Sequence, residues 1–234
     1  MRKPTIVMTQ TRAYDCDEAE ILHYPFIKIA PLTINTQTFK ATYDWLIFSS
    51  ANAVHYFESY MAQIDVRHIA VIGSQTAAYC ASLGIEVDFC PDQFDQEGFL
   101  AQFEVTHGMR ICIPSSAAAR PLLVDTLRAC GAFVEKVDLY EPVANIDNIM
   151  TVQQLLIDRC VDVLTFSSSS AVRYWYDHGA LQQQSARHIP AVFAIGPQTE
   201  ETLQTYGIRA QVSEVATLDA MINKILESWN KSEI

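Results

Sequence analysis

Short apolar segments alternate with stretches of helical periodicity along the whole chain. The segments are five to eight residues long, are rich in β-branched and aromatic side chains, and end at polar turns, which is typical of strands. Most are apolar at successive positions, and this predicts parallel sheets covered by helices on both faces. The predicted strands are residues 5–9, 26–30, 45–49, 69–73, 86–90, 110–114, 133–140, 162–167, 191–196 and 209–213.

Two helices carry clear signals of their own. Apolar residues recur at helical spacing from Thr217 to Trp229, which predicts an amphipathic helix over that range. A second helix is expected to begin near Pro121, because proline suits the first helical turn, and to stop before Gly131.

An internal repeat is the most informative feature of the sequence. Residues 44–56 (DWLIFSSANAVHY) match residues 162–174 (DVLTFSSSSAVRY), and each copy continues in kind, into residues 70–85 and 192–208. Each copy encodes a strand, a sharp turn at glycine, a helix and a second glycine suited to a left-handed helix end.

A weaker echo relates TIVMTQ…IKIAPL near the N-terminus to RICIPS…DLYEPV in the middle of the chain. The chain has 234 residues, which fits one large domain or two small ones. Two copies of one layout, each about 110 residues long, favour two similar α/β domains.

Composition narrows the function classes. Sixteen basic and 27 acidic residues give a net charge of −11, which disfavours nucleic acid and anionic membranes as partners. The six cysteines form no C-x-x-C motif and mostly lie in apolar segments, which predicts buried, reduced thiols. The apolar stretch after the N-terminus is too short for a signal peptide, and no run would span a bilayer, so we expect a soluble cytoplasmic protein.

Several common chemical motifs are missing from the sequence. It contains no G-x-G-x-x-G, no G-x-x-x-x-G-K-[ST], no H-E-x-x-H and no cysteine pair with metal-ligand spacing. Nicotinamide, nucleoside triphosphate and structural zinc therefore lose support, and we expect no cofactor and no metal. The six histidines are scattered, and their spacing assigns no Ser-His-Asp triad.

Small polar residues recur where a predicted strand passes into the next helix. Helix capping alone explains serine, threonine and asparagine at such steps. Ligands also bind at the carboxyl ends of parallel strands, and helix N-termini attract anions, so the same residues could hold a multiply charged anion. The residues at these steps are Ser49, Ser50 and Asn52; Ser74 and Thr76; Ser115 and Ser116; Ser167 to Ser170; and Gln198 and Thr199.

The ordered set DWLIFSSANAVHYF, IAVIGSQTAAYCASLGI, FSSSSAV and FAIGPQTEETL resembles the uroporphyrinogen-III synthase family, from about Thr5 to Leu226. The resemblance implies two flavodoxin-like parallel-sheet α/β domains joined by two linkers, the first domain being discontinuous. Projected onto this chain, residues 1–32 plus 147–234 form the first domain and residues 36–142 the second. The linkers fall at residues 31–36 and 142–147.

The resemblance also implies an activity. Members of the family convert the linear tetrapyrrole hydroxymethylbilane into uroporphyrinogen III, with inversion of ring D and loss of water, in tetrapyrrole (heme) biosynthesis. The substrate supplies the electronics, so such a lyase needs no cofactor and mainly positions a flexible chain. A monomer is expected.

The same resemblance carries site residues onto this chain. Tyr140 stands where the family has a tyrosine able to protonate the departing hydroxyl, although packing at a strand end would also explain it. Gln198 stands where many relatives have threonine, and the stretch from Arg12 to Pro25 is shorter than usual, which predicts an abbreviated first helix. The implied substrate-binding residues are Arg12, Ser50, Asn52, Thr76, Ser115, Ser169, Gln198 and Thr199, with Arg120 and Arg173 as weaker candidates.

Two alternatives stay open at this point. A cofactor-independent racemase also has two similar α/β domains, but it needs a cysteine at an equivalent strand end in both halves, where this repeat has serine and threonine. A non-catalytic anion-binding or regulatory protein of the same architecture is the second alternative.

Overall fold

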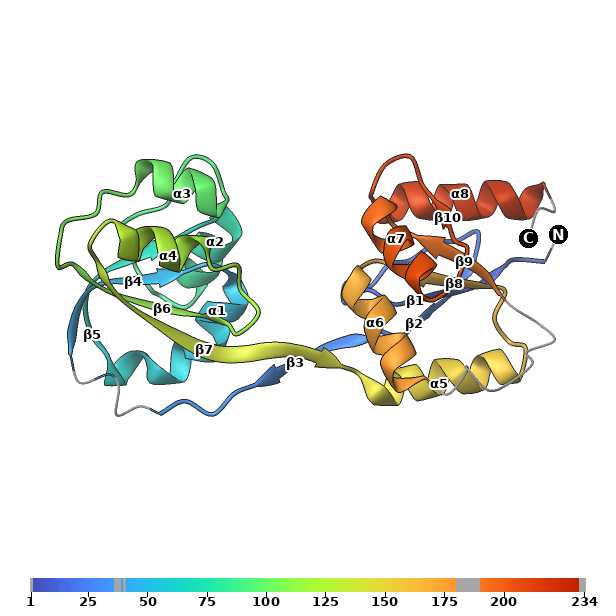
Figure 1. Cartoon of the computed structure of the whole chain (residues 1–234), viewed down its shortest axis with the longest axis horizontal. Coiled ribbons are helices and arrows are strands. Elements are labelled where there is room, and N and C mark those ends of the chain that lie inside the picture. The colour runs from blue at the N-terminus through green and yellow to red at the C-terminus, as the bar shows by residue number, and fades with distance from the viewer. Residues whose placement is uncertain (1, 36–38, 40, 180–189, 232–234) are drawn as a thin grey trace. The chain divides into compact units, whose positions relative to one another are not determined.

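The computed structural model describes residues 2–35, 39, 41–179 and 190–231. Contacts divide the chain into two compact units, each described here by itself (Figure 1). Unit 1 comprises Met1–Lys28 and Val143–Ile234, and unit 2 comprises Ile29–Pro142. Each unit holds a five-stranded sheet flanked by helices, so the mixed α/β class is confirmed.

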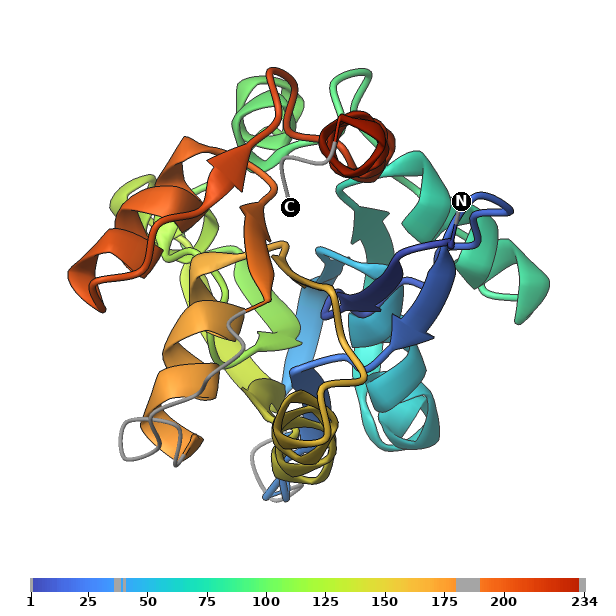
Figure 2. The same cartoon turned by 90° about the vertical axis from the view of Figure 1, so that its right-hand side faces the viewer.

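The sheet of unit 1 has the strand order β10-β9-β8-β1-β2, and its neighbouring strands are parallel. Helices α5, α6 and α7 contribute to the core on one face of this sheet, and α8 to the core on the other. Seen nearly end-on, α5 (yellow) and α8 (red) lie on opposite sides of the strands (Figure 2). The elements are β1 (Thr5–Met8), β2 (Glu20–His23), α5 (Ile146–Ile157), β8 (Val163–Phe166), α6 (Ser169–His178), β9 (Ala191–Ala194), α7 (Pro197–Thr205), β10 (Gln211–Val212) and α8 (Leu218–Asn230).

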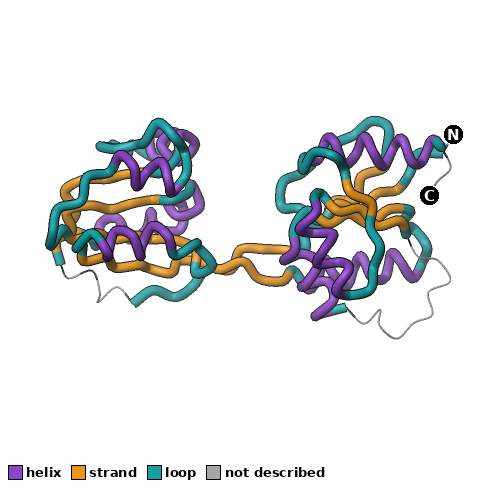
Figure 3. The backbone as a smooth tube through the Cα atoms, turned by 45° about the horizontal axis from the view of Figure 1, so that its top comes forward, coloured by secondary structure: helices purple, strands orange, loops and turns teal. Residues whose placement is uncertain are grey.

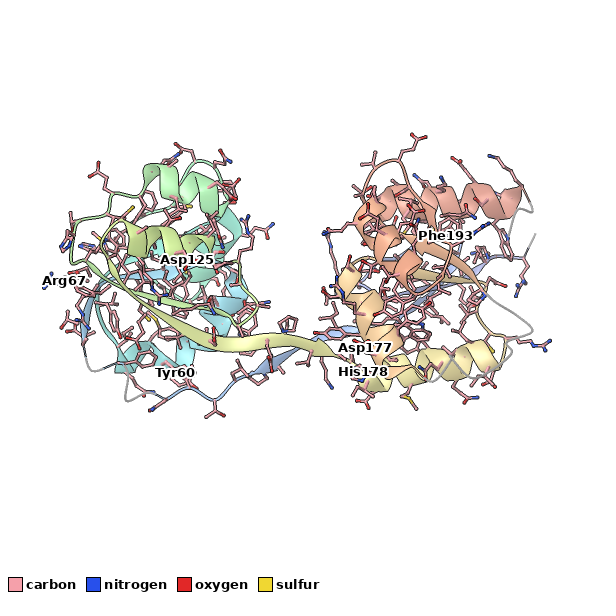
Figure 4. The ribbon with its side chains drawn as sticks, in the orientation of Figure 1. Tyr60, Arg67, Asp125, Asp177, His178 and Phe193 are labelled. Carbon is pink, nitrogen blue, oxygen red and sulfur yellow. The ribbon has the colours of Figure 1, made fainter. Side chains whose placement is uncertain are left out.

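Strand β1 shows why both faces of this sheet are apolar. Ile6 and Met8 belong to the α8 core, whereas Val7 between them belongs to the opposite core, as the alternation of a strand requires. In that opposite core, the Phe26 ring stacks on Trp175 with ring centroids 5.0 Å apart. Phe193 of β9 is fully buried inside unit 1 (Figure 4).

The sheet of unit 2 has the strand order β3-β7-β6-β4-β5. Helices α1 and α2 belong to the core on one face, and α3 and α4 to the core on the other, so helices flank the strands on both sides (Figure 3). The elements are β3 (Ile27–Pro31), β4 (Thr42–Phe48), α1 (Ala51–Phe57), the 3-10 helix η2 (Glu58–Gln63), β5 (Asp65–Val71), α2 (Ser74–Ser82), α3 (Gln96–Gln102), β6 (Arg110–Ser116), α4 (Leu122–Ala129) and β7 (Phe133–Ala144).

Both predicted helices with clear signals are confirmed. Helix α8 begins after Thr217, whose side chain accepts a hydrogen bond from the N–H of Ala220, and it ends at Asn230. Helix α4 begins after Pro121 and ends at Ala129, two residues before Gly131.

The strand register shows that the two copies of the sequence repeat occupy equivalent positions in their sheets. Trp45 and Val163 are equivalent in the repeat; Trp45 pairs with Ile111 of β6, and Val163 pairs with Ile6 of β1. Strand β6 therefore lies beside β4 as β1 lies beside β8. The weak echo between residues 5–10 and 110–115 marks these two equivalent strands.

In each unit, an equivalent aspartate accepts a hydrogen bond from the backbone of the neighbouring strand. The backbone N–H of Thr5 donates to Asp162 Oδ2 at 2.8 Å, and that of Arg110 donates to Asp44 Oδ2 at 2.9 Å. Both carboxylates thus satisfy the first N–H of the neighbouring strand. The aspartate that opens both copies of the repeat is explained by this structural role.

Three expectations about elements differ from the structure. The predicted strand 86–90 is reduced to one isolated bridge between Phe89 and Ala70. Strand β2 has no clear sequence signal, because EILH is only four residues long and both of its end residues, Glu20 and His23, are polar. No helix lies between β1 and β2: residues 11–19 turn and bend, and Tyr14 and Ala19 pack on the α8 side of the sheet.

Most of the segment 142–147, a linker by the family resemblance, lies in a strand or a helix. Strand β7 continues to Ala144, and α5 begins at Ile146. In the other suggested linker, 31–36, Pro31 ends β3, and Thr36 lies outside the described residues.

The expectation of mostly buried cysteines is wrong. All six thiols are free, but only Cys80 and Cys112 are buried, and burial raises the pKa of both. Cys130 and Cys160 follow the ends of α4 and α5, where the chain turns at the surface, and Cys90 is also exposed. In the part of the chain that the structure describes, no helix is long and apolar enough to cross a membrane.

Candidate functional site

In each sheet, two neighbouring strands lead into connections that run in opposite directions across the sheet, and the boundary between these two strands is the switch point. In unit 1 this point lies between β1 and β8, and in unit 2 it lies between β4 and β6. Ligands of open α/β sheets bind outside the carboxyl ends of the strands at such a point. A ligand is therefore expected at that edge of each unit.

In unit 2 the structure brings Ser50 and Tyr140 together. Ser50 is the N-cap of α1, and its Oγ accepts a hydrogen bond from the N–H of Ala53 at 3.2 Å. The same Oγ lies 3.1 Å from Tyr140 Oη, and either hydroxyl can donate. One serine thus caps the helix and also contacts the tyrosine that the family resemblance singles out.

The end of β7 explains how Tyr140 reaches that position. A bulge interrupts the β6–β7 register between Ser115 and Ser116, and Ser116 then pairs with Tyr140. Bulges re-aim side chains at sheet edges. The Tyr140 ring lies 5.0 Å from that of Tyr56, centroid to centroid, and Tyr140 is 6% exposed. The residue is therefore both packed against a ring and hydrogen-bonded through its hydroxyl.

The other unit 2 candidates lie at the same edge without contacting Tyr140 through a hydrogen bond. Asn52 is exposed in the first turn of α1. Thr76 is buried in the first turn of α2. Ser115 is buried, and its hydroxyl lies 3.5 Å from the carbonyl oxygen of Ser116.

In unit 1 the helix cap falls on Ser168 rather than on Ser169. Ser168 Oγ accepts from the N–H of Ala171 at 3.2 Å, the same contact and distance as in the equivalent cap of unit 2. Ser169 instead donates to the carbonyl oxygen of Gln198 at 3.1 Å, and Thr202 Oγ1 lies 2.9 Å from Ser169 Oγ. The hydroxyl of Ser169 therefore links α6 to α7.

The remaining unit 1 candidates are divided between buried and exposed positions. Thr199 occupies the third helical position of α7, as Thr76 does in α2, and each is 5% exposed. Gln198 and Arg12 are exposed, Arg12 in the loop after β1. Among the described residues, no hydrogen bond or ion pair joins Arg12 to another candidate.

Sequence reasoning missed Gln10, which follows β1. Gln10 is 8% exposed, its Oε1 has no hydrogen-bond partner within the described chain, and its carbonyl oxygen lies 2.7 Å from His23 Nε2. By register, Gln10 is the counterpart of Ser115. The echo between the two strands could have found it, because Ser115 was already a candidate.

Two further observations concern chemistry that the sequence left without support. Over the described ranges, no group of three His, Cys, Asp or Glu side chains is arranged to hold a metal ion. The strand ends of the repeat carry Ser49–Ser50 and Ser167–Ser168, where a two-thiol racemase would need cysteine.

Comparison with known proteins decides the family. A family model described as uroporphyrinogen-III synthase HemD matches residues 13–223. The chain belongs to the uroporphyrinogen-III synthase family. Among curated relatives, the uroporphyrinogen-III synthase of Synechococcus elongatus is 32% identical over 205 residues, covering 81% of this chain and 76% of the relative. The porphyrin biosynthesis protein HemD of Ruminiclostridium josui is 28% identical, covering 89% of this chain but only 44% of the relative, so the chain spans less than half of that protein.

Solved structures support the fold of this family member. The uroporphyrinogen-III synthetase of Helicobacter pylori superposes with a TM-score of 0.59 at 15% identity, covering 97% of this chain and 99% of that one. A mutant uroporphyrinogen III synthase of Thermus thermophilus gives a TM-score of 0.52 at 15% identity, with 90% of each chain covered. The family model and the relatives' names point to uroporphyrinogen-III synthase in porphyrin biosynthesis and do not favour a non-catalytic protein.

Proposed function

We propose that this chain closes hydroxymethylbilane to uroporphyrinogen III, with inversion of ring D and loss of water. The observation that carries the proposal is the Ser50–Tyr140 hydroxyl pair at the carboxyl edge of unit 2, in a chain of this family. The reaction is a lyase reaction in which the substrate supplies the electrons. No cofactor has a role in it.

The chemistry begins with departure of the terminal hydroxyl. A pyrrole nitrogen donates electron density, the C–O bond breaks, and the hydroxyl leaves as water once it has gained a proton. The resulting azafulvene is attacked by the substituted carbon of ring D, which gives a spiro intermediate. That intermediate breaks and recloses with ring D inverted, and the final loss of a proton restores aromaticity.

Tyr140 is the proposed proton donor for the departing hydroxyl. Ser50 Oγ already accepts from a backbone N–H, so its own proton is available for Tyr140 Oη. When Tyr140 gives up its proton, a hydrogen bond from Ser50 stabilises the phenolate that forms. The N-cap position fixes this serine and thereby orients the acid.

The remaining candidates are proposed to bind substrate carboxylates. Neutral donors suit this task in a protein of net charge −11, because hydroxyl and amide groups bind an anion without a surrounding positive field. Arg12 is the one charged donor among them. The proposed binding residues are Arg12, Ser50, Asn52, Thr76, Ser115, Ser169, Gln198 and Thr199.

The proposal includes the domain plan that the family implies. The order β2-β1-β8-β9-β10 in unit 1 follows the flavodoxin-like order, with the switch between the first strand and the third, and this supports flavodoxin-like domains. The expected domains are residues 1–32 with 147–234 and residues 36–142, with segments 31–36 and 142–147 connecting them. The enzyme is proposed to act as a monomer in the cytoplasm on a small-molecule substrate.

A product assay tests the function directly. Hydroxymethylbilane is generated in situ, the chain is added, and the type I and type III isomers are separated. Accumulation of type III above the reaction without the chain supports the proposal. Type I alone, at the spontaneous rate, would instead support the non-catalytic anion-binding alternative.

A further inference from the structure

A cavity of about 340 Å³ opens at the edge of unit 2 opposite Tyr140. It is formed where β4, β6 and β7 begin, whereas Ser50 and Tyr140 lie where β4 and β7 approach their ends. Strand β6 runs from Arg110 to Ser116, so the two edges are separated by about 20 Å at roughly 3.3 Å per residue. The lining residues are Tyr43, Arg110, Arg128, Ala132, Phe133, Val134 and Glu135.

Two arginines from different elements line this cavity. Arg110 is the first residue of β6, and Arg128 lies in the last turn of α4. Arg128 Nη2 donates to the carbonyl oxygen of Val134 at 2.9 Å, which holds its guanidinium beside the start of β7. Within the described ranges, neither arginine pairs with a carboxylate, unlike Arg2, Arg67 and Arg120.

The lining carries one net positive charge. Glu135 supplies one carboxylate against the two guanidiniums, and this carboxylate accepts a hydrogen bond from Tyr43 Oη. Burial and that hydrogen bond raise the pKa of Tyr43, so the phenol stays protonated. A positively charged cavity in a chain of net charge −11 suits a monoanion rather than a phosphate ester or a polycarboxylate.

The rest of the lining is apolar. Phe133 is 65% exposed at the start of β7, and Ala132 and Val134 flank it. An exposed aromatic side chain beside unpaired arginines offers a ring face to an apolar ligand body. The cavity volume lies at the lower end of the range for small-molecule sites, so the ligand is small.

Unit 1 lacks this arrangement at the equivalent place. Arg110 pairs across the sheet with Phe133, and the equivalent pair in unit 1 is Thr5 with Glu20. There the Thr5 hydroxyl donates to Glu20 Oε2 at 3.2 Å, so the polar groups satisfy each other. The cavity residues are therefore not required by the fold that the two units share.

We infer that this cavity binds a small organic monoanion with an aromatic or apolar body, its carboxylate between Arg110 and Arg128 and its body against Phe133. The site is separate from the residues proposed to bind the tetrapyrrole. No covalent step is involved.

The test uses phenylacetate as probe and phenylacetamide as its neutral match, in NMR titrations of the full chain. Phenylacetate is expected to shift the amide signals of residues 132–135 saturably, and phenylacetamide to bind at least about tenfold more weakly, because it lacks the charge. Arg110→Gln and Arg128→Gln should each weaken phenylacetate binding at least about tenfold. Phe133→Ser should weaken the binding of both phenylacetate and phenylacetamide.

Arg209→Gln is the control, because Arg209 is an exposed arginine of unit 1 that lies outside the lining. It should leave phenylacetate binding within about twofold of wild type, because it changes only a charge outside the cavity, whose effect on the probe is screened by salt. The amide spectra of all variants verify their fold. The inference is overturned if no saturable shift occurs at residues 132–135, if phenylacetamide binds equally well, or if Arg209→Gln weakens binding as much as Arg110→Gln.

Discussion

The two units begin a helix with the same serine but place different groups beside it. Ser50 and Ser168 share the cap contact at 3.2 Å and nearly identical backbone angles. The hydroxyl of Tyr140 lies next to Ser50. Near the unit 1 cap, the hydroxyls of Ser169 in α6 and Thr202 in α7 instead form hydrogen bonds that join these two helices. A shared scaffold therefore carries a serine–tyrosine hydroxyl pair in one unit and a helix-to-helix link in the other.

The units also differ on one face of their sheets. In unit 2, α4 connects β6 to β7 and packs in the same core as α3. In unit 1, the equivalent connection from β1 to β2 has no helix, and Tyr14 anchors it by donating to Asp219 Oδ1 of α8 at 2.7 Å. A loop that Tyr14 fastens to α8 thus stands in unit 1 where unit 2 has a helix.

The largest expected effect follows from removing the Tyr140 hydroxyl. Tyr140→Phe keeps the ring and its packing against Tyr56 but removes the proposed proton donor, so the rate of type III formation should fall by about 100-fold or more. The measurement is the isomer-resolved product assay. Tyr79→Phe, which removes a hydroxyl contact with His55 on the helices of the same unit, is the control and should retain the rate. An undiminished rate in Tyr140→Phe would assign that tyrosine to packing.

The next effect tests the repeated aspartate. Asp162→Ala should lower the free energy of unfolding by about 2 kcal/mol, and Asp44→Ala by about 1 kcal/mol, because each leaves a strand N–H without its charged acceptor. The ranking follows from exposure: the side chain of Asp162 is 15% exposed and that of Asp44 is 30% exposed. Urea unfolding measures the loss, and faster hydrogen exchange at the Thr5 or Arg110 amide localises it.

Asp177→Ala is the control for both variants, since Asp177 is an exposed carboxylate near the end of α6 (Figure 4). It should change the stability by less than about 0.5 kcal/mol. A larger loss in Asp44→Ala than in Asp162→Ala would contradict the ranking by side-chain exposure.

Much of this comparison could be read from the sequence. The repeat located both capped helices, and the weak echo correctly related β1 to β6, because buried strands and capping residues leave local patterns. The Ser50–Tyr140 pair could not be predicted, since it depends on a bulge between Ser115 and Ser116. The sequence also could not identify the N-cap of α6, because each of the four serines after β8 has the required hydroxyl.

A smaller effect concerns Thr165, a buried threonine of unit 1. Thr165 Oγ1 donates to the carbonyl oxygen of Val7 at 2.9 Å, and the equivalent residue in unit 2 is Ile47. Thr165→Val should cost about 1 kcal/mol of unfolding free energy, because a buried hydrogen bond is lost at constant shape. The reverse exchange, Ile47→Thr, tests whether unit 2 can form the same bond to Cys112. A cost of about 1 kcal/mol would show that it can, and a cost of about 3 kcal/mol that the hydroxyl stays unsatisfied.

The smallest effect concerns the Tyr14 anchor and appears mainly at alkaline pH. The hydrogen bond to Asp219 and, next, burial raise the pKa of Tyr14 from 10.0 to about 12. A phenol whose pKa is raised by folding contributes its full stabilisation below pH 10 and loses it as the pH rises from about 10 to about 12.

Tyr14→Phe should therefore lower the free energy of unfolding by about 0.5 to 1 kcal/mol near neutral pH. The variant should also lose less stability than wild type between pH 10 and 12, measured by urea unfolding at each pH. Asp219→Asn keeps an acceptor but removes the charge, so it should lower the Tyr14 pKa and move the alkaline loss to lower pH. Equal alkaline losses in wild type and Tyr14→Phe would mean that the Tyr14 hydroxyl does not hold the β1–β2 connection.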